Sequence, residues 1–421
     1  MADRSRYTAF GLTWLSYATY YTGRKGFSVA KKTLAERYGI SELTLGAIDT
    51  LYLTAYAGGQ FLNGLLGDRI GARRLVGYGM LASAACCGIF GLGSAAWVFG
   101  IAFALNGLAQ STGWPGNTRA MAEWTTPATR GTVMSLWATC YQVGGIVATV
   151  LAGWLLVRSG WRSTFFGPAA LMALVGVLVL LWLRPGPGAE PPAETDTVVD
   201  LQRGAVHREL RRESTAVLRR RAQARLLRSP TLWFYGASYF FIKFIRYALL
   251  FWLPYFLAQR LGYDADVAAY VSSAFEVGGI AGVIVIGIAS DRLRRFSRSA
   301  MAAVWLVGLS ASLLVYALAG FEGIWGNAVV LAMIGAMLFG PDSLLSGAAA
   351  QDAGGPHAAA TATGFVNGLG SLGAILEGLT VPLISARYGW QAVFPVFVVL
   401  ALLAAGCLLP TLRRGPAPRG I

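Results

Sequence analysis

Long apolar runs recur along the whole chain and are separated by short polar breaks. About twelve of them are long enough to cross a bilayer as helices, which takes roughly 20 residues each. They form two groups of six: 9–33, 43–66, 73–94, 97–122, 131–157 and 162–183, then 231–259, 265–289, 299–319, 324–349, 358–385 and 390–411. A helix satisfies its own backbone in lipid, and these runs are about twice as long as a barrel strand. The pattern predicts an all-α membrane protein with about 12 transmembrane helices in two six-helix halves.

Arginines gather in alternate breaks between the runs. Arg4 and Arg6 precede the first run, Arg69 follows the second, and Arg413 and Arg414 follow the last. Cytoplasmic loops of membrane proteins are enriched in cations, so we expect both termini in the cytoplasm. The chain uses far more arginine than lysine, which is typical of a GC-rich bacterial genome. We therefore expect a multi-pass protein of a bacterial inner membrane.

The longest break, 184–230, mixes Pro and Gly with acidic residues and then becomes rich in arginine. We interpret it as a solvated cytoplasmic linker, part helical, that lies on the anionic inner leaflet. It divides the chain into an N-terminal half, 1–183, and a C-terminal half, 231–421.

Composition agrees with a membrane protein and limits the other classes. Hydrophobic residues make up 55% of the chain and charged residues only 13%. The net charge of +15 is also typical of nucleic-acid binders, but the arginines lie where membrane topology places them, so we expect no nucleic-acid partner. The four cysteines lack metal-ligand spacing, and no glycine loop for a nucleotide is present. We expect no metal, no cofactor and no enzymatic activity.

The two halves repeat a short motif between their second and third runs. The copies "GLLGDRIGARR" and "GIASDRLRR" begin at Gly64 and Gly287, 223 residues apart, and the same offset relates the Asp-Arg pair in each. A glycine followed by this pair suits a tight turn with a charge-locked cytoplasmic end, and two copies in register indicate pseudo-symmetric halves. The candidate residues for this conformational motif are Asp68, Arg69, Asp291 and Arg292.

A second repeat places cations inside apolar runs. Each set is spaced i, i+4, i+7 and so lies on one helical face: Tyr17, Tyr21 and Arg24 in the first run, and Tyr239, Lys243 and Arg246 in the seventh. An intramembrane cation costs several kcal/mol unless it faces a cavity or is paired. Two guanidinium groups can each give forked hydrogen bonds to phosphate oxygens. The repeat predicts an anion site between the halves, although a carboxylate ligand, or internal pairing that only locks the fold, stays open.

These motifs resemble the major facilitator superfamily and, within it, the organophosphate:inorganic phosphate antiporters of the glycerol-3-phosphate, hexose-phosphate and glucose-6-phosphate type. "YATYYTGRKGF" resembles their first-helix Tyr-x-x-x-Tyr-x-x-Arg-Lys motif, and "IRYALLFWLPY" their seventh-helix arginine motif. "NGLAQSTGWPG" at 106–116 resembles their fourth-helix Gly-Trp-Pro stretch, and "FEVGGIAGVIVIGIASDR" at 275–292 the eighth helix of the eukaryotic glucose-6-phosphate type. The resemblance covers nearly the whole chain.

The resemblance implies the major facilitator fold and exchange of an organophosphate for inorganic phosphate by alternating access. The organic substrate would be a sugar phosphate, glycerol phosphate or related phosphorylated or phosphonate anion. Arg24 and Arg246 would clamp the phosphate, and Tyr17 and Tyr21 would line the site.

The chain departs from the family pattern in ways that affect the substrate. Gln60 stands where many relatives have a lysine, and Tyr141 stands where the glycerol-3-phosphate type has histidine. Lys243 would restore a positive charge from the opposite half. Asp342 and Glu377 are unexpected carboxylates within the tenth and eleventh runs. Either could pair with Lys243 or hold the amine of a zwitterionic substrate, so the organic moiety stays open.

An empty site with two or three unpaired cations would resist closing, which favours obligatory exchange over uniport. We expect the chain to act as a monomer. Two alternatives belong to other classes. A proton-coupled carrier of organic anions or drugs would use Asp342, Glu377 or Asp49 as its titrating group. A transporter-like membrane sensor of sugar phosphates would bind its ligand with little flux.

Overall fold

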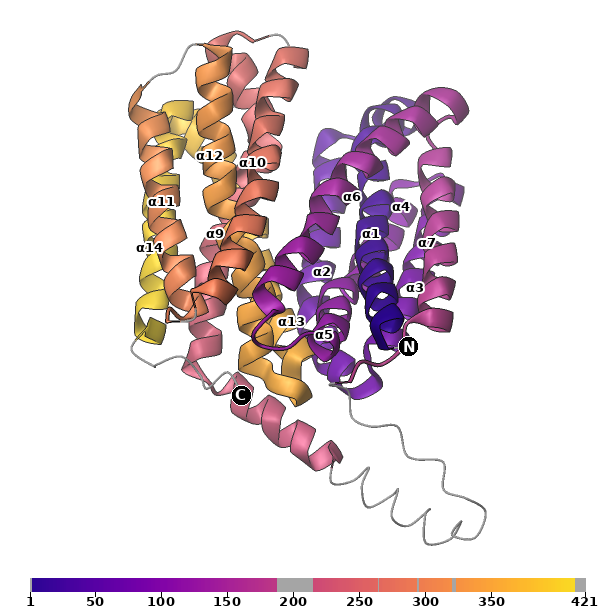
Figure 1. The fold of residues 1–421 in the computed structure, drawn as a ribbon. Coiled ribbons are helices and arrows are strands. Elements are labelled where there is room, and N and C mark those ends of the chain that lie inside the picture. The colour runs from indigo at the N-terminus through magenta and orange to yellow at the C-terminus, as the bar shows by residue number, and fades with distance from the viewer. Residues whose placement is uncertain (1, 188–214, 264, 294, 320–322, 413–421) are drawn as a thin grey trace, which may run out of the picture.

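The computed structural model describes residues 2–187, 215–263, 265–293, 295–319 and 323–412, and every regular element in these ranges is a helix. Two helical bundles stand side by side (Figure 1). The first contains α1 (Ala2–Tyr38), α2 (Glu42–Ile70), α3 (Ala72–Leu92), α4 (Ala96–Gln110), α5 (Gly113–Trp124), α6 (Arg130–Ser159) and α7 (Ser163–Trp182). The second contains α9 (Pro230–Leu261), α10 (Ala265–Arg292), α11 (Arg298–Ala319), α12 (Ile324–Ser343), α13 (Ala350–Tyr388) and α14 (Val393–Leu412).

Each predicted run corresponds to a helical segment, and the prediction of an all-α membrane fold in two halves is confirmed. The boundaries agree to within a few residues, except that α1 extends the first run at both ends and α13 begins before the eleventh run. Eight stretches of described helix are long and apolar enough to cross a membrane. The first helix, α1, is not among them, because its tyrosines and cations lower its mean hydropathy.

The predicted fourth run is two helices that meet at Ser111 and Thr112. Pro115 has no backbone N–H to donate to the carbonyl of Ser111, one turn earlier, so the regular hydrogen-bond pattern breaks there. At the same place the Ser111 hydroxyl donates to the carbonyl of Leu108 at 2.6 Å. This break lies beside Trp114, whose side chain reaches the space between the two bundles.

The tenth and eleventh runs are joined by continuous helix. α12 passes through a π-helical turn (Leu344–Ala349) into α13, and the chain bends within α13 at Gly355 and Ala358. Gly355 has φ +60°, a conformation that only glycine adopts without strain. The bend gives the second part of α13 its own helix start, near Ala360.

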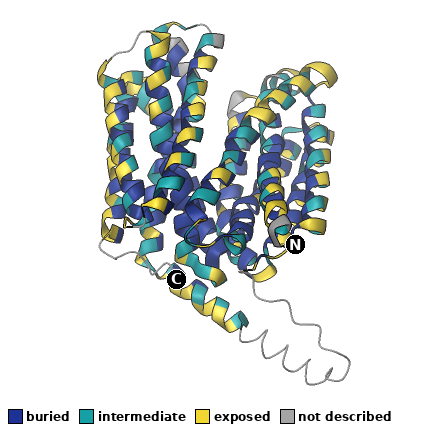
Figure 2. Ribbon diagram, viewed as in Figure 1, coloured by how far each residue is buried: buried dark blue, intermediate teal, exposed yellow. Residues whose placement is uncertain are grey.

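Large apolar side chains cover the outer faces of both bundles. Val157 and Leu318, for example, are 89% and 77% exposed. Buried residues fill the bundle interiors and the region where the bundles meet (Figure 2). An apolar outer surface of this extent suits contact with lipid, as the membrane fold requires.

The bundles meet near the end at which α1 begins and α14 ends, which we call the base (Figure 1). There α2 and α5 pack on α13, and α6 packs on α10. A Cβ on Gly64 would lie 2.9 Å from the carbonyl oxygen of Ala360, and one on Gly287 would lie 2.7 Å from that of Gly131. Both motif glycines therefore allow close contact between helices of opposite halves, whereas we had predicted a turn at these positions.

Candidate functional site

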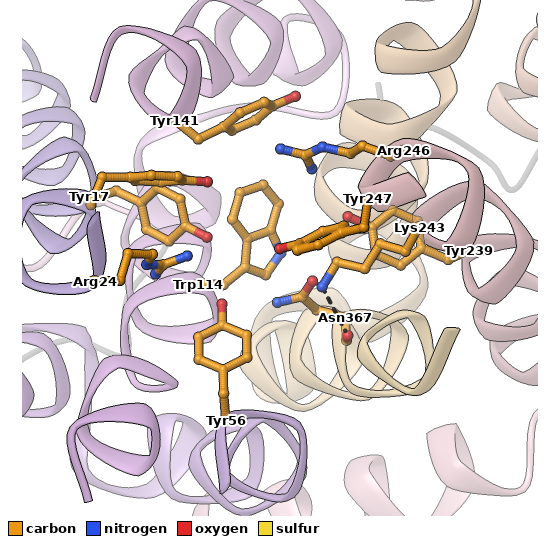
Figure 3. Close-up of a pocket in the computed structure, with 11 residues that line it drawn as sticks. Tyr17, Arg24, Tyr56, Trp114, Tyr141, Tyr239, Lys243, Arg246, Tyr247 and Asn367 are labelled. Carbon is orange, nitrogen blue, oxygen red and sulfur yellow. Dashed lines mark hydrogen bonds between the residues drawn. The ribbon is translucent and has the colours of Figure 1, made fainter. Parts of the chain in front are cut away.

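A cavity lies between the two bundles and encloses about 290 Å³ of space not filled by atoms, counting the part open to solvent. Figure 3 shows side chains of the first half facing those of the second across it. It is lined by Tyr17, Tyr21 and Arg24 of α1, Tyr56 of α2, Trp114 of α5, Tyr141 of α6, Tyr239, Lys243, Arg246 and Tyr247 of α9, and Asn367 of α13. The structure thus brings together all the predicted substrate-binding residues except Gln60.

Arg24 is held by a neutral partner. Its Nε donates to the side-chain oxygen of Gln110 at 3.0 Å, and that oxygen also accepts a hydrogen bond from the Tyr52 hydroxyl at 2.9 Å. The guanidinium carbon lies 4.4 Å from the ring centre of Tyr21 and 5.5 Å from that of Tyr56. Nη2 of Arg24 is buried without a hydrogen-bond partner. Among the described residues no carboxylate pairs with Arg24, so its charge is uncompensated.

Gln110 is itself fixed by neighbouring polar groups. Its amide nitrogen donates to the Ser83 hydroxyl and to the side-chain oxygen of Asn106, both at 3.3 Å. All three side chains are buried. The amide oxygen is thereby directed at Arg24, and the guanidinium is held in place.

Arg246 has a charged partner. Its Nη1 donates to both carboxylate oxygens of Asp342, at 3.2 and 3.1 Å, and the Tyr141 hydroxyl donates to one of them at 3.3 Å. Asp342 is 1% exposed. Nε of Arg246 is buried without a partner. Our expectation that Asp342 could pair with Lys243 was therefore wrong, because the carboxylate pairs with the arginine instead.

Lys243 completes the positive side of the cavity. Its Nζ donates to the Ser371 hydroxyl at 2.9 Å and to the backbone carbonyl of Asn367 at 3.5 Å, the bond drawn as a dashed line in Figure 3. The ammonium also lies 5.6 Å from the ring centre of Tyr239 and 5.8 Å from that of Tyr247. Neutral oxygens and aromatic faces thus stabilise the cation without neutralising it.

Aromatic rings form most of the remaining wall. Tyr17 and Tyr239 are 5% and 1% exposed. The ring of Tyr17 packs edge-on against Trp114, with 5.3 Å between centroids. Such walls exclude water and leave hydroxyl groups and cationic donors as the polar contacts, an arrangement typical of small-molecule sites.

Asp342 contacts two lining residues but is not itself part of the lining, and three further predicted polar residues also lie outside it. Gln60 is fully buried in α2, and neither atom of its amide group has a hydrogen-bond partner. Glu377 is buried beside Trp252 of α9, which donates a hydrogen bond to it. Asp49 forms an ion pair with Lys31 of α1. Gln60 was predicted to bind substrate because many relatives have a lysine at this position, but its shorter amide side chain is fully buried and does not line the cavity.

Several residues that line the cavity or hold Arg24 in place were missed by the sequence analysis. Tyr52 and Tyr56 repeat the i, i+4 tyrosine spacing of the first helix, and this signal was available. Trp114 lies in the Gly-Trp-Pro stretch, and Asn367 begins a glycine-rich stretch of α13. Gln110 carries no such signal, because its contact with Arg24 depends on how α4 packs beside α1.

At the base, Asp68 joins the two halves. Its side chain accepts hydrogen bonds from the backbone N–H groups of Ala360 and Thr361, at 3.0 and 2.9 Å, where the second part of α13 begins. Nη1 of Arg119 in α5 lies 2.8 Å from the same carboxylate. A carboxylate at a helix start is stabilised by free backbone N–H groups and by the helix dipole.

Asp291 makes the equivalent contact in the opposite direction. It accepts hydrogen bonds from the backbone N–H groups of Gly131 and Thr132, at 3.1 and 2.6 Å, where α6 begins. Nη1 of Arg298 lies 3.1 Å from it. Each half therefore caps a helix of the other half, and both caps close the base.

The arginines of the repeated motif take no part in these contacts. Arg69 and Arg292 are exposed, and both aspartates lie in the last turn of a helix instead of in a loop. The arginines that form ion pairs at the base lie outside the motif: Asp352 of α13, for example, pairs with both Arg130 and Arg298. Tertiary packing decides which groups the side chains in the last turn of a helix contact, and the motif did not reveal these contacts.

The predicted linker lies only partly within the described residues, because 188–214 fall outside them. Residues 215–227 form a helix at the base. Its Gln223 donates to the Thr361 hydroxyl at 3.0 Å and to the carbonyl of Leu65 at 3.3 Å, so it contacts both halves. Arg220 and Arg221 on the same helix are exposed.

Comparisons with known proteins agree with this architecture. A family model described as Major Facilitator Superfamily matches residues 13–378. A probable hexose phosphate transport protein of Chlamydia pneumoniae is 29% identical over 96% of this chain and 91% of its own length. The Bos taurus glucose-6-phosphate exchanger SLC37A2 is 30% identical, with 96% and 93% covered. The membrane sensor protein UhpC of Salmonella typhimurium is 30% identical, with 96% and 91% covered.

Among solved structures, the crystal structure of the human organic anion transporter MFSD10 (TETRAN) superposes with a TM-score of 0.71 over 96% of this chain and 99% of that chain. The sequence identity is 16%, so this similarity concerns the fold alone. The resemblance to the organophosphate:inorganic phosphate antiporters is confirmed by the relatives above.

Proposed function

We propose that this chain, which belongs to the major facilitator superfamily and to its organophosphate:phosphate antiporter branch, is a secondary transporter. It exchanges an organophosphate, such as a sugar phosphate, for inorganic phosphate by alternating access. The observation that carries this proposal is the placement of Arg24 and Arg246, from equivalent helices of the two halves, on one enclosed cavity.

The cavity's chemistry fits a phosphate group. Arg24 and Arg246 each keep a buried N–H donor without a partner, and Lys243 adds a third positive charge. A phosphate monoester carries close to two negative charges at neutral pH and three acceptor oxygens, which match such donors. The tyrosine hydroxyls around the cavity can orient the attached organic group.

Transport follows from the arrangement of the two halves. The base is closed by Asp68 and Asp291, so the site opens to that side only after both caps break. A bound anion neutralises the cavity and lets the halves rock about it. The empty cavity keeps Arg24 and Lys243 without an anionic partner, and this residual charge opposes reorientation and favours exchange.

The carrier spans the inner membrane of a bacterium with the base and both termini on the cytoplasmic side. The arginine-rich breaks and the arginines of helix 215–227 support this orientation. Both halves of one chain contribute to the cavity lining, which is compatible with function as a monomer.

A second candidate function is sensing. One of the relatives is a membrane sensor protein, and a sensor would use the same cavity to bind a phosphorylated ligand with little flux. Binding without exchange would distinguish it from a carrier. The alternative of proton coupling depends on Glu377 alone among its three candidate groups, since Asp342 and Asp49 both have cationic partners.

Phosphate counterflow tests the proposed function. Purified protein is placed in liposomes loaded with inorganic phosphate, and uptake of external labelled phosphate is measured for the wild type, Arg24→Lys and Arg246→Lys. Arg74→Lys, an exposed position at the base end of α3, is the matched control. Rapid uptake by wild type and control that needs internal phosphate and is lost in the two cavity variants supports the antiporter. Folded wild-type protein that binds phosphate but does not exchange it would indicate a sensor.

A further inference from the structure

The partners of the two cavity arginines differ in charge, although the arginines occupy equivalent places in the repeat. Arg24 is bound to the neutral amide of Gln110, whereas Arg246 is bound to the buried carboxylate of Asp342. Asp342 lies on α12, and the element of the first half that corresponds to it is α4 with α5, whose acid, Glu123, pairs with Arg119 and not with Arg24. The two halves therefore differ in one negative charge: the second half places a carboxylate beside its cavity arginine, and the first half places an amide there.

The contact between Arg246 and Asp342 is not the strongest that these groups can form. Both carboxylate oxygens approach the same nitrogen, Nη1, at 3.2 and 3.1 Å, instead of a fork over two nitrogens. Nε of Arg246 is left buried and unbonded. A phosphate that takes a forked pair on this guanidinium can therefore make a better contact than the one Asp342 makes.

The carboxylate also stays close to any phosphate bound there. Tyr141 donates to Asp342 from the first half, and Tyr141 itself lines the cavity. In a buried site two anions near one guanidinium repel each other strongly, because little water screens them. Phosphate bound to Arg246 must either displace Asp342 or tolerate its charge, and both weaken binding.

We propose that Asp342 is a built-in competitor of the substrate: it neutralises Arg246 in the empty cavity and promotes release of bound phosphate. This inference rests on the proposed function. No described carboxylate pairs with Arg24, so Arg24 binds the phosphate first. Arg246 then binds it when the contact between Arg246 and Asp342 breaks. When the phosphate leaves, the ion pair between Asp342 and Arg246 forms again, so the guanidinium does not remain unpaired. Asp342 thus acts on the bound phosphate through Arg246, and it need not itself touch the substrate.

The test compares affinity with turnover. Binding of inorganic phosphate to the purified full-length protein and maximal counterflow in liposomes are measured for wild type, Asp342→Asn, Asp342→Glu and Asp49→Asn. Asp49 is the matched control, because its removal also breaks an intramembrane ion pair, with Lys31, but outside the cavity lining. Should the Asn variant not yield monodisperse protein, Asp342→Ser is the second neutral variant.

We expect the neutral variants to bind phosphate about tenfold more tightly, the change that about 1.4 kcal/mol produces, and to exchange it more slowly at saturation. Asp342→Glu should bind no more tightly than wild type, and Asp49→Asn should match wild type. The proposal is overturned if wild type binds phosphate and the neutral variants bind it equally or more weakly, or if the Glu variant binds it more tightly. Absence of phosphate binding in wild type would instead overturn the proposed function, and this inference with it.

Discussion

Equivalent residues of the two halves make the same contacts at the base but different contacts in the cavity. At the base, Asp68 and Asp291 make the same contact, a carboxylate on the backbone N–H groups at a helix start in the other half. In the cavity, Arg24 and Arg246 have different partners, an amide and a carboxylate. The repeat is kept where the halves close on each other and broken in the cavity, where we propose that a ligand binds.

This difference suggests separate tasks. Symmetric caps form and break together, so both halves contribute equally to closing the base. An asymmetric pair of arginines lets one side hold the ligand while the other controls its release. A symmetric cavity would bind a dianion strongly but would have nothing to compete with it.

The largest expected effect comes from the arginines themselves. Arg24→Lys and Arg246→Lys each replace a forked donor by a point charge, which removes one or two charge-assisted hydrogen bonds to phosphate. Each should reduce exchange by about 100-fold, as a loss of about 3 kcal/mol produces. Phosphate affinity should fall more for Arg24→Lys, because Arg246 already has an anionic partner when the site is empty. Equal losses of affinity, measured by titration calorimetry, would contradict this difference.

Changing Gln110 to Glu would make the two sides of the cavity alike. The new carboxylate would meet Arg24 at the position that the amide oxygen occupies now, 3.0 Å from Nε. Phosphate should then bind about tenfold more weakly, the inverse of the effect expected for Asp342→Asn. Gln110→Ala, which removes the contact without adding charge, is the control and should weaken binding less. A Glu variant that binds as wild type does would show that the partner's charge is unimportant.

The symmetric caps should respond equally to substitution. Asp68→Asn and Asp291→Asn each weaken a helix cap between the halves, an interaction worth about 0.5–2 kcal/mol. We expect a several-fold shift towards an open base in both variants. Spin labels at two exposed positions, Arg74 on α3 of the first half and Arg228 just before α9 of the second, would report it as longer distances by pulsed electron paramagnetic resonance. A shift in only one variant would mean that the caps are not equivalent.

The smallest effect is expected for Tyr52→Phe. This change removes one hydrogen bond to the oxygen of Gln110 and leaves the bond to Arg24 in place. One neutral hydrogen bond contributes about 0.5–1.5 kcal/mol, so phosphate affinity should change about threefold. An effect as large as that of Arg24→Lys would show that Tyr52 does more than orient Gln110. Titration of the purified variant measures it.

Much of the architecture could be predicted from the sequence. The apolar runs indicated the helical segments, and the repeated tyrosine and cation spacing indicated which faces of α1 and α9 meet the cavity. Gln60 shows a limit of the family resemblance, since it stands where many relatives have a lysine but is fully buried outside the cavity lining. The bend at Gly355, which creates the helix start that Asp68 caps, was not predicted either.

The sequence by itself determined the helices, their two groups of six and the cations on α1 and α9, because helical period and hydropathy are local properties of the chain. Only the tertiary structure decided what each charged group contacts. Arg24 and Gln110 are 86 residues apart, Arg246 and Asp342 are 96 apart, and Asp68 and Thr361 are 293 apart. Contacts over such separations depend on how the helices pack, and packing is a property of the whole fold.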